Sequence, residues 1–293
     1  MTITTAEIEA RAMRHAIALS AWGRGTTSPN PPVGCVVLDS DGRSVGQGWH
    51  RRKGEPHAEA HALAQAGRAA AGGTAVVTLE PCCHHGHTPP CHRALIEAGI
   101  ARVVIAVLDP TSRGRGGAAL LHEAGIGVAV GFLAEEAHLV LGPWLAALER
   151  QRPVLTWGCS LTPRGTLTSD ATALPREIDT LVHDDTTATT ATEWPTSRPL
   201  FTLPNDPHHA LDALHHDGTR TAGLAVDHVT AQPYLDTGLI DHIEAHSAHE
   251  AAHLPNLPDG YRLAQISHLN NGLRLSLSRN STNAQTPSPS SQR

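Results

Sequence analysis

Along the first 150 residues, short apolar runs alternate with stretches in which apolar residues recur at helical spacing. This pattern predicts strands interleaved with helices. Short apolar runs rich in β-forming residues predict strands at 33–38, 44–49, 74–79, 102–108 and 128–130. Apolar positions at helical spacing predict helices at 5–21, 57–71, 91–98, 115–124 and 134–141, the last interrupted at Pro143. This order predicts an α/β layer whose sheet is largely parallel after a first hairpin.

The pattern changes near residue 150, where the chain becomes richer in Thr, His, Pro and Asp and its periodicity weakens. Expected strands lie at 154–159, 221–226 and 273–277, and expected helices at 178–182 and 209–215. After residue 279 the sequence consists mainly of Ser, Asn, Thr, Pro and Gln, which predicts disorder. We therefore predict a first domain at 1–149, a second, smaller domain at 150–279 and a disordered tail at 280–293.

The composition is typical of a two-domain protein and argues against two classes of partner. A chain of 293 residues exceeds the usual size of one domain, and its 3% aromatic content requires a core of Ala, Val, Leu and Ile. The formal net charge of −6 disfavours a nucleic-acid scaffold, which usually presents a basic face. No run reaches the roughly 20 apolar residues of a membrane span, and residues 1–10 do not resemble a signal peptide. We expect a soluble, cytoplasmic protein that binds neither nucleic acid nor membrane.

Three of the five cysteines fall within ten positions, which is typical of metal binding rather than of a disulfide framework. Cys82 and Cys91 each follow a proline, and His57-Ala58-Glu59 lies upstream. Zinc-dependent deaminases carry His-x-Glu followed by Pro-Cys-x-x-Cys, and the difference here is that eight residues separate the two cysteines. We predict that His57, Cys82 and Cys91 bind Zn²⁺ and leave its fourth position open for water.

The expected elements place these residues where the chemistry needs them. Cys82 follows the strand at 74–79, at the end where ligands of α/β sheets usually bind, and Cys91 opens a helix whose N-terminus favours thiolate. Glu59 follows His57 by two residues in a first helical turn, so its carboxylate reaches the water while the imidazole binds the metal. We predict Glu59 as the catalytic acid and base; the alternative is an acid that only complements the helix dipole.

Other polar residues near these motifs are candidates for substrate contacts. A fourth protein ligand would close the catalytic position, so we expect His84, His85 and His87 to line the substrate entrance instead of binding the metal. Asn30 and His50 lie in loops beside apolar strands, and their spacing alone favours structural roles.

Seven segments between residues 30 and 116 carry a resemblance to a known family. They are Asn30-Pro31-Pro32-Val33-Gly34, Val45-Gly46-x-Gly48-x-His50, His57-Ala58-Glu59, Thr78-Leu79-Glu80-Pro81-Cys82, Thr88-Pro89-Pro90-Cys91, Asp109-Pro110 and Gly114-Arg115-Gly116. Over about residues 6–150 the sequence resembles the bifunctional deaminase/reductase of riboflavin biosynthesis, within the cytidine-deaminase-like superfamily.

The resemblance implies both a fold and a reaction. The fold is a three-layer α/β/α cytidine-deaminase-like domain followed by a smaller α/β dihydrofolate-reductase-like domain. The reaction is the hydrolytic removal of an amino group from a phosphoribosylated diaminopyrimidinone. The implied zinc ligands and proton-shuttling acid are the residues already named from the motif. The implied substrate contacts are Asn30, His50 and the position of His87, where the family usually has Lys or Arg.

The second domain departs from the family at the positions that serve reduction. Thr156 stands where the family has Lys, and Thr162-Pro163 replaces Asp-Gly. The Glu-Gly-Gly that approaches the NADPH phosphates is replaced by Val226-Asp227-His228, which offers a carboxylate instead of a close backbone approach. We predict a degenerate reductase domain that binds no NADPH. This leaves open a homo-oligomer formed through this domain and a separate reductase in the pathway.

Several functions remain open from the sequence. The changes at His87 and Thr111-Ser112-Arg113 allow a repurposed deaminase that accepts another aminated heterocycle in a specialised pathway. A non-catalytic scaffold with structural zinc is a second alternative, although such a site would have no use for Glu59. Editing of nucleic acid is disfavoured by the acidic balance and the few aromatic residues.

Overall fold

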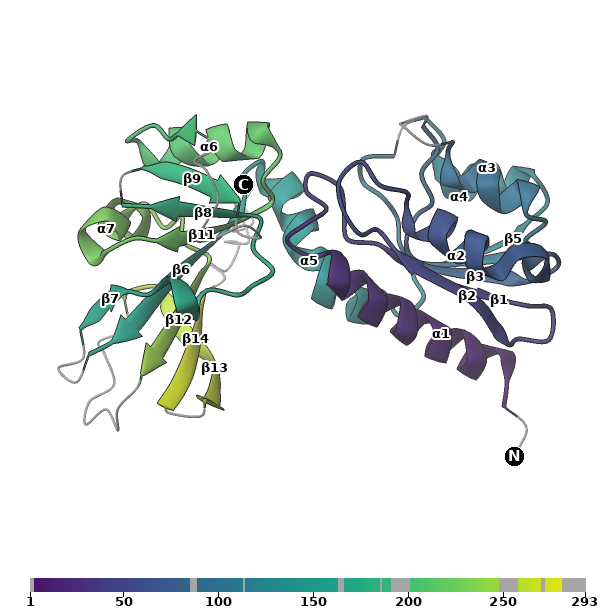
Figure 1. Cartoon of the computed structure of the whole chain (residues 1–293), viewed down its shortest axis with the longest axis horizontal. Coiled ribbons are helices and arrows are strands. Elements are labelled where there is room, and N and C mark those ends of the chain that lie inside the picture. Colours follow the sequence, from purple (N-terminus) through teal and green to yellow (C-terminus); the bar gives the residue numbers. More distant parts are fainter. Residues whose placement is uncertain are drawn as a thin grey trace, which may run out of the picture.

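The computed structural model describes residues 3–84, 89–112, 114–162, 166–184, 186–190, 201–247, 258–269 and 272–280. Within these residues the chain forms two units, each built around its own β-sheet, and helix α5 (Ala134–Arg150) lies between them (Figure 1). Buried hydrophobic residues between 12 and 144 form one core, and those between 155 and 277 form another. The tail expected at 280–293 lies outside the described residues except for Asn280.

The first unit contains a five-stranded sheet in the order β2-β1-β3-β4-β5. Its strands are β1 (Gly34–Leu38), β2 (Ser44–Trp49), β3 (Thr74–Leu79), β4 (Arg102–Val107) and β5 (Gly127–Val130). β1 is antiparallel to both β2 and β3, whereas β3, β4 and β5 are parallel to one another. The predicted order, a first hairpin followed by parallel strands, is therefore confirmed.

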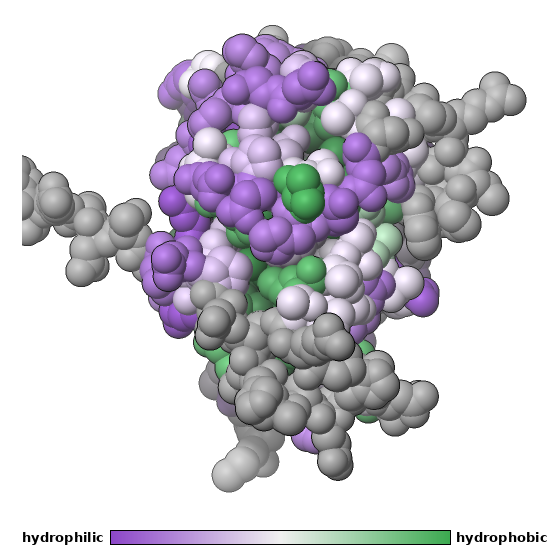
Figure 2. Space-filling model, turned by 90° about the vertical axis from the view of Figure 1, so that its left-hand side faces the viewer, coloured by the Kyte–Doolittle hydropathy of each residue, from purple (hydrophilic) through white to green (hydrophobic). Residues whose placement is uncertain are grey.

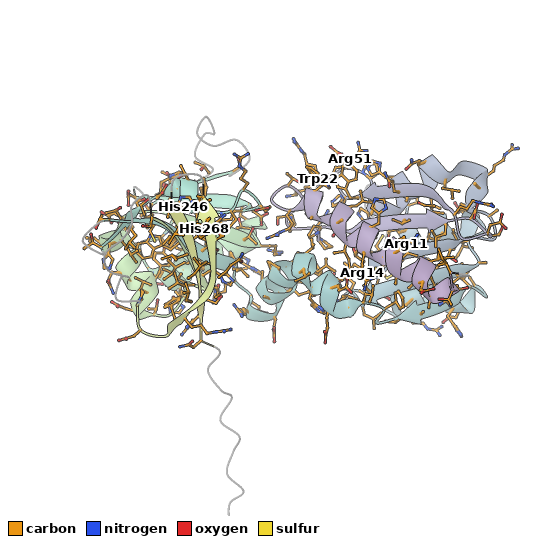
Figure 3. All side chains as sticks on the ribbon, turned by 90° about the horizontal axis from the view of Figure 1, so that it is seen from below. Arg11, Arg14, Trp22, Arg51, His246 and His268 are labelled. Atoms are coloured by element: carbon orange, nitrogen blue, oxygen red, sulfur yellow. The ribbon has the colours of Figure 1, made fainter. Side chains whose placement is uncertain are left out.

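Helices cover both faces of this sheet and produce three layers (Figure 1). α1 (Thr5–Ser20) and α5 lie on one face, and α2 (Ala58–Ala66), α3 (Cys91–Glu97) and α4 (Gly116–Glu123) lie on the other. On the surface, Nε and Nη2 of Arg14 in α1 (labelled in Figure 3) each donate to the carboxylate of Glu136 in α5 at 2.9 Å.

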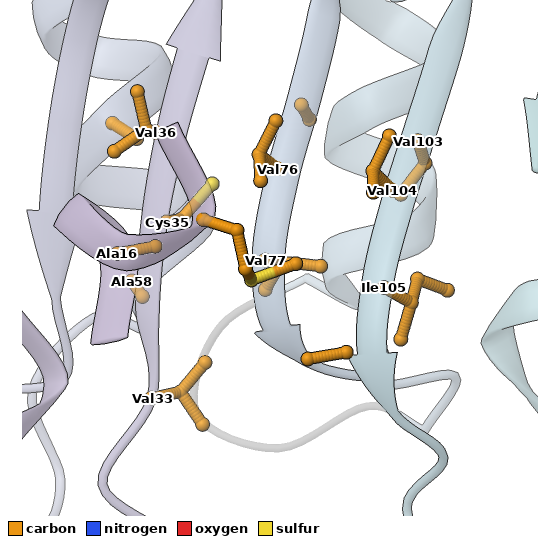
Figure 4. Packing of buried hydrophobic residues seen from close by; sticks show 14 of the residues in the cluster. Ala16, Val33, Cys35, Val36, Ala58, Val76, Val77, Val103, Val104 and Ile105 are labelled. Carbon is orange, nitrogen blue, oxygen red and sulfur yellow. The ribbon is translucent and has the colours of Figure 1, made fainter. Parts of the chain in front are cut away.

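Small and β-branched side chains allow this close packing (Figure 4). A Cβ atom on Gly34 would lie 1.9 Å from the carbonyl oxygen of Ala16, so α1 lies directly against the backbone of β1. Val76, Val77 and Ile105 are fully buried on the neighbouring strands. The core thus consists mainly of Ala, Val, Leu and Ile, as the composition predicts, with Trp144 as a buried aromatic member.

The prediction that Pro143 interrupts the fifth helix is wrong, because α5 continues through it to Arg150. A proline inside a helix removes one hydrogen bond to the carbonyl four residues earlier, here that of Leu139. The Leu139 side chain is 74% exposed, so the affected part of the helix faces solvent. Water can satisfy the freed carbonyl there, which makes the proline tolerable.

The second unit contains a nine-stranded sheet with the order β10-β9-β8-β11-β6-β12-β14-β13, and β7 pairs with β6. Its strands are β6 (Val154–Leu161), β7 (Leu167–Ser169), β8 (Thr180–His183), β9 (Thr187–Thr190), β10 (Phe201–Thr202), β11 (Thr221–Ala225), β12 (His242–Ser247), β13 (Tyr261–Leu269) and β14 (Gly272–Arg279). The central strands β8, β11, β6 and β12 are parallel. The described helices of this unit include α6 (Pro207–Asp217) and α7 (His228–Asp236).

The helix expected at 178–182 is wrong, whereas the one expected at 209–215 is confirmed within α6. The first segment forms strand β8, where Leu181 and Val182 are buried between two neighbouring strands. A short apolar run fits a buried strand and a helix equally well, so its hydrophobic periodicity cannot distinguish the two. α6 instead has clear end signals, since Asp206 caps its first turn and Gly218 ends it in a left-handed conformation.

Polar contacts join the two units around the loop that precedes β1. The hydroxyl of Ser28 donates to Asp179 Oδ2 at 2.6 Å, and a Cβ atom on Gly218 would lie 3.2 Å from Pro29. At the end of α5, Arg150 binds the buried carboxylate of Asp241 at 2.7 Å. The face of the second unit turned away from this junction is largely hydrophilic, with separate hydrophobic residues (Figure 2).

Candidate active site

His57, Cys82 and Cys91 come together at the carboxyl end of β3. His57 is the N-cap residue of α2, Cys82 follows β3, and Cys91 is the first residue of α3. Their candidate ligand atoms all lie within 4.8 Å of one another. Nδ1 of His57 is 3.6 Å from Sγ of Cys82 and 3.3 Å from Sγ of Cys91.

These separations fit a tetrahedral zinc ion. With Zn–S bonds of about 2.3 Å and Zn–N bonds of about 2.0 Å, a tetrahedral site separates a sulfur from a nitrogen ligand by roughly 3.5 Å. The two observed distances, 3.3 and 3.6 Å, lie on either side of this value. The backbone N–H of Cys91 also donates to Sγ of Cys82 at 3.3 Å, which stabilises negative charge on that sulfur. The donor set and its spacing therefore fit zinc with three protein ligands.

The protonation of the two thiols points to the same chemistry. The hydrogen bond from Cys91, together with the bonds from His57, lowers the pKa of Cys82 to about 4 despite burial. The same contact between the thiols, and then burial, raises the pKa of Cys91. Without a metal, one thiol loses its proton easily and the other keeps it. A divalent cation would bind both sulfurs as thiolates.

Glu59 lies beside this group in the first turn of α2, and it is only 3% exposed. Burial raises the pKa of its carboxyl group, and the charge of His57 opposes the rise. The carboxyl group also forms a hydrogen bond with Cys91. A buried acid of raised pKa next to a metal group has the protonation behaviour that general acid–base catalysis needs.

A cavity of about 490 Å³ opens onto Glu59 and the metal group. The predicted residues Asn30, His50 and His84 line it, as does Thr111. His85 and His87 lie outside the described residues. Cys83 lies beside Cys82 but is not one of the three residues that the geometry groups together. The volume suits a small heterocyclic ligand.

Asn30 and His50 form one oriented pair in this cavity. Nδ1 of His50 lies 3.2 Å from the carbonyl oxygen of Pro56, which can only accept, so this nitrogen carries the proton. Burial lowers the pKa of His50 and favours the neutral ring, so Nε2 accepts the 3.3 Å hydrogen bond from the Asn30 amide nitrogen. The carbonyl oxygen of the Asn30 side chain is thereby the end available to a ligand.

Residues that sequence reasoning missed complete the cavity wall. Trp144 and Leu148 come from α5, Lys53 from the loop before His57, and Arg220 from the second unit. The indole N–H of Trp144 also donates to the carbonyl oxygen of Pro29 at 2.9 Å and so holds the loop that carries Asn30. No local motif marks these residues, because only the folded chain brings them together.

Glu80 is a second missed residue, and it explains two of the matched segments. Its buried carboxylate accepts hydrogen bonds from the backbone N–H groups of Asp109 and Ala118 and from the hydroxyl of Ser112. A Cβ atom on Gly116 would lie 2.6 Å from this carboxylate. Glu80 therefore ties the segment that carries Cys82 to the loop between β4 and α4.

In the second unit, carboxylates lie at the start of α7, where the sequence departs from the Glu-Gly-Gly of the family. Asp227 is the N-cap of α7, and its side chain accepts from the N–H of Thr230 at 2.8 Å. Its own N–H donates to Asp184 at 2.8 Å. Near the other predicted departures, Ser160 donates to Asp170 at 2.5 Å and His246 lies 3.4 Å from the same carboxylate (Figure 3). A helix N-terminus whose N–H groups already bind a carboxylate disfavours the binding of phosphate, which carries the same sign of charge.

Comparisons with known proteins give the family of the chain. Residues 6–107 match the family model described as the cytidine and deoxycytidylate deaminase zinc-binding region. The riboflavin biosynthesis protein RibD of Escherichia coli is 49% identical over 160 residues, which cover 54% of this chain and 43% of that protein. The diaminohydroxyphosphoribosylamino-pyrimidine deaminase of Buchnera aphidicola from Schizaphis graminum is 49% identical over 126 residues, 43% of this chain and 85% of that protein. The matched part thus spans less than half the length of the RibD relatives.

Solved structures extend the likeness in fold to both units. RibD of Acinetobacter baumannii has a TM-score of 0.79 at 24% identity and covers 94% of this chain and all of that one. The deaminase/reductase of Thermotoga maritima has a TM-score of 0.77 at 21% identity with the same coverage. The predicted fold, a deaminase domain followed by a reductase-like domain, is confirmed. The chain therefore belongs to the zinc-dependent deaminase family of riboflavin biosynthesis that includes RibD and the diaminohydroxyphosphoribosylaminopyrimidine deaminases.

Proposed function

We propose that the chain is a zinc-dependent hydrolase that deaminates the phosphoribosylamino-diaminopyrimidinone of riboflavin biosynthesis. The observation that carries the proposal is Glu59, a buried acid that lines the same cavity as His57 and Cys82, two of the three candidate metal ligands. A purely structural zinc site would not need such an acid. The names of the relatives support the choice of substrate.

The protein's part in the reaction is to bind the ring and move protons. His57, Cys82 and Cys91 would hold the metal, which supplies Lewis acidity and lowers the pKa of water toward neutrality. The reaction replaces an exocyclic amino group by the oxygen of water and releases ammonia. It needs one proton moved to the ring nitrogen and one to the leaving amine. Glu59 takes protons at its carboxylate from the water and delivers them to these two nitrogens.

The remaining cavity residues orient the substrate. The Asn30 amide, held by His50, presents its carbonyl oxygen as an acceptor for ring or amino N–H groups. We assign His87 to substrate contact as well, on the resemblance alone, because it lies outside the described residues. An alternative, a deaminase of another aminated heterocycle, is favoured by Thr111, which lines the cavity in place of the family's usual Asn.

We further propose that the second unit carries out no reduction. Thr156, where the family has Lys, is buried within β6. The carboxylates of Asp227 and Asp184 each accept a backbone N–H group at the start of α7, where the family approaches the NADPH phosphates. Oligomer formation through this unit and a separate reductase in the pathway stay predictions. So does a cytoplasmic location; none of the helices in the described part of the chain has both the length and the apolar character needed to cross a bilayer.

A paired assay tests both proposals. Purified protein of known zinc content is given the phosphoribosylated diaminopyrimidinone and NADPH, and ammonia release and NADPH consumption are followed together. Ammonia without NADPH consumption supports a deaminase with an inactive second unit. Consumption of NADPH after deamination would contradict the assignment of Thr156 and Asp227. Zinc-loaded protein that releases no ammonia would redirect the search to another heterocycle.

A further inference from the structure

Arg220 belongs to the second unit, yet it lines the cavity that contains Glu59. It directly precedes β11, and its carbonyl oxygen accepts from the N–H of Val154 at the start of β6. The same cavity wall includes Trp144 and Leu148 of α5, the helix that lies between the units. The reductase-like unit therefore contributes a cation to the deaminase cavity.

The guanidinium group of Arg220 is held by backbone carbonyl oxygens, and the negative charge of Asp179 acts on it without a hydrogen bond between the two side chains among the described residues. Its Nη1 donates to the carbonyl oxygens of His215 and Thr219, both at 3.1 Å. Its Nε is buried and has no hydrogen-bond partner in the described structure. Burying a cation whose N–H donor has no acceptor costs free energy, and a bound anion would lower that cost.

The nearest acid does not supply that anion. Oδ2 of Asp179 accepts the backbone N–H groups of Arg220 and Thr221 at 2.9 and 2.8 Å and the Ser28 hydroxyl at 2.6 Å. Asp179 thus fixes the backbone around Arg220 and joins it to the loop of Asn30, and its charge favours the guanidinium cation, while its Oδ2 accepts from backbone N–H groups and from Ser28. Arg220 is placed to face a ligand of the first unit rather than a residue of its own.

The other charges of the cavity are distributed in a way that favours an anion at one end. Of the acids in the cavity lining, Glu80 and Asp109 accept backbone N–H groups of the segment 109–118, whereas Glu55 lies exposed near Lys53. Lys53, an exposed residue, adds a second cation to the cavity lining. A ligand with an aminated ring and an anionic tail would match a cavity that offers Glu59 and the metal group together with Arg220.

We propose that Arg220 of the second unit binds the phosphate group of the deaminase substrate, so that the unit serves recognition instead of reduction. This inference rests on the proposed function for the identity of the ring, but not for the binding of the anion. The phosphate would accept from the guanidinium group of Arg220, whose planar arrangement of donors suits phosphate oxygens.

Calorimetric titration with ribose 5-phosphate tests the inference without any turnover. We expect the full-length, zinc-loaded protein to bind this probe, and Arg220→Ala to bind it about tenfold to a hundredfold more weakly. Arg220→Lys should recover part of the affinity, because it restores the charge without the planar donors. Thermal unfolding of each variant shows that it remains folded.

Arg150→Ala is the matched control. Arg150 also lies at the junction and, with Arg220, lines a second cavity of about 820 Å³, but it does not line the cavity of Glu59. We expect this variant to bind the probe as the wild type does. Equal weakening by both substitutions would place the anion in the second cavity and overturn the proposal, as would unchanged binding in Arg220→Ala.

Kinetics then separate this inference from the proposed function. With the phosphorylated substrate, Arg220→Ala should raise KM about tenfold to a hundredfold with kcat largely retained. With the dephosphorylated compound, wild type and variant should have the same kcat/KM. Equal losses on both compounds would mean that Arg220 acts only on structure. A wild type that binds ribose 5-phosphate through Arg220 but releases no ammonia would refute the proposed function and leave the anion site standing.

Discussion

The Asn30 amide nitrogen donates to Nε2 of His50 at 3.3 Å, and the carbonyl oxygen of Pro56 fixes the other side of the same ring. The pair joins the loop before β1 to the loop before α2, so the orientation of one side chain determines that of the other. The substrate contact that we propose for Asn30 therefore depends on a neutral His50 ring whose Nε2 accepts a hydrogen bond.

Replacing Asn30 by Asp tests this dependence. A carboxylate cannot donate to a neutral Nε2, so the pair would lose its hydrogen bond and the substrate would meet a negative charge. We expect kcat/KM for deamination to fall about tenfold to a hundredfold with unchanged zinc content. Arg24→Ala, in the same loop but outside the lining of this cavity, is the control and should keep wild-type kinetics. Wild-type kinetics in Asn30→Asp would contradict the assignment.

Removal of one metal ligand should remove the metal. His57→Ala leaves two cysteines, which cannot hold zinc with three protein ligands, so we expect zinc content to fall below about 0.1 per chain after dialysis. Mass spectrometry of the metal measures it, and Cys83→Ser is the neighbouring control, expected to keep a full equivalent. Stoichiometric zinc in His57→Ala would mean that the ligand set is different.

Glu59→Gln should separate metal binding from proton transfer. The amide keeps the size of the side chain but cannot exchange a proton with the substrate, so we expect kcat to fall by a factor of about 10² to 10⁴. Zinc content should equal that of the wild type. A scaffold function predicts the opposite, a variant indistinguishable from the wild type in every assay of its biological role.

The charge of Asp170 should make the second unit less stable in acid. Burial alone would raise the pKa of Asp170, but hydrogen bonds from Ser160 and Thr172 and the nearby His246 lower it below its usual value. A carboxylate of lowered pKa contributes stability above its unfolded pKa and loses it as pH falls through the folded value.

Asp170→Asn keeps the acceptor for the Thr172 N–H but removes the charge and the Oδ2 acceptor of the Ser160 hydroxyl. We expect it to lower the free energy of unfolding near pH 7 by no more than about 1 kcal/mol, because the site is partly exposed. The difference from wild type should shrink as the pH falls below about 4 and vanish near pH 2. Chemical denaturation at several pH values measures it, and a difference that grows in acid would refute the argument.

Asp227→Ala should affect stability but not cofactor binding. The substitution removes the acceptor for the Thr230 N–H at the start of α7, which we expect to cost about 1 kcal/mol of unfolding free energy. Asp184 would remain beside the helix end, so NADPH should still not bind. Fluorescence titration with NADPH checks this, and saturable binding would show that Asp227 alone prevents it.

The first half of the fold could be predicted because its local signals agree with one another. Each strand of the first sheet is a short run of β-forming residues, and each helix between them has an end signal within a few residues. In the second unit such signals are weak. The segment of β8 is too short for its hydrophobic periodicity to distinguish strand from helix, and β11, its parallel neighbour in the sheet, lies far away in sequence.

The candidate site likewise contains residues that the sequence predicts and residues that it does not. His57, Glu59, Cys82 and Cys91 follow a spacing that local chemistry imposes, so the sequence alone brings them into one hypothesis. Arg220 could not be found by any spacing. It enters the cavity only because Asp179 binds Ser28 across the junction and Gly218 lies against Pro29.

The capped start of α7 also limits how this chain can evolve. Substituting Asp227 leaves Asp184 at the same helix end, and substituting Asp184 leaves the cap in place. Either single change costs stability and restores no glycine for close phosphate approach. With the loss of NADPH binding that we propose, the return of a nucleotide site would require several simultaneous mutations through less stable intermediates. Selection on this unit would then act on its shape and on the proposed role of Arg220 rather than on reduction.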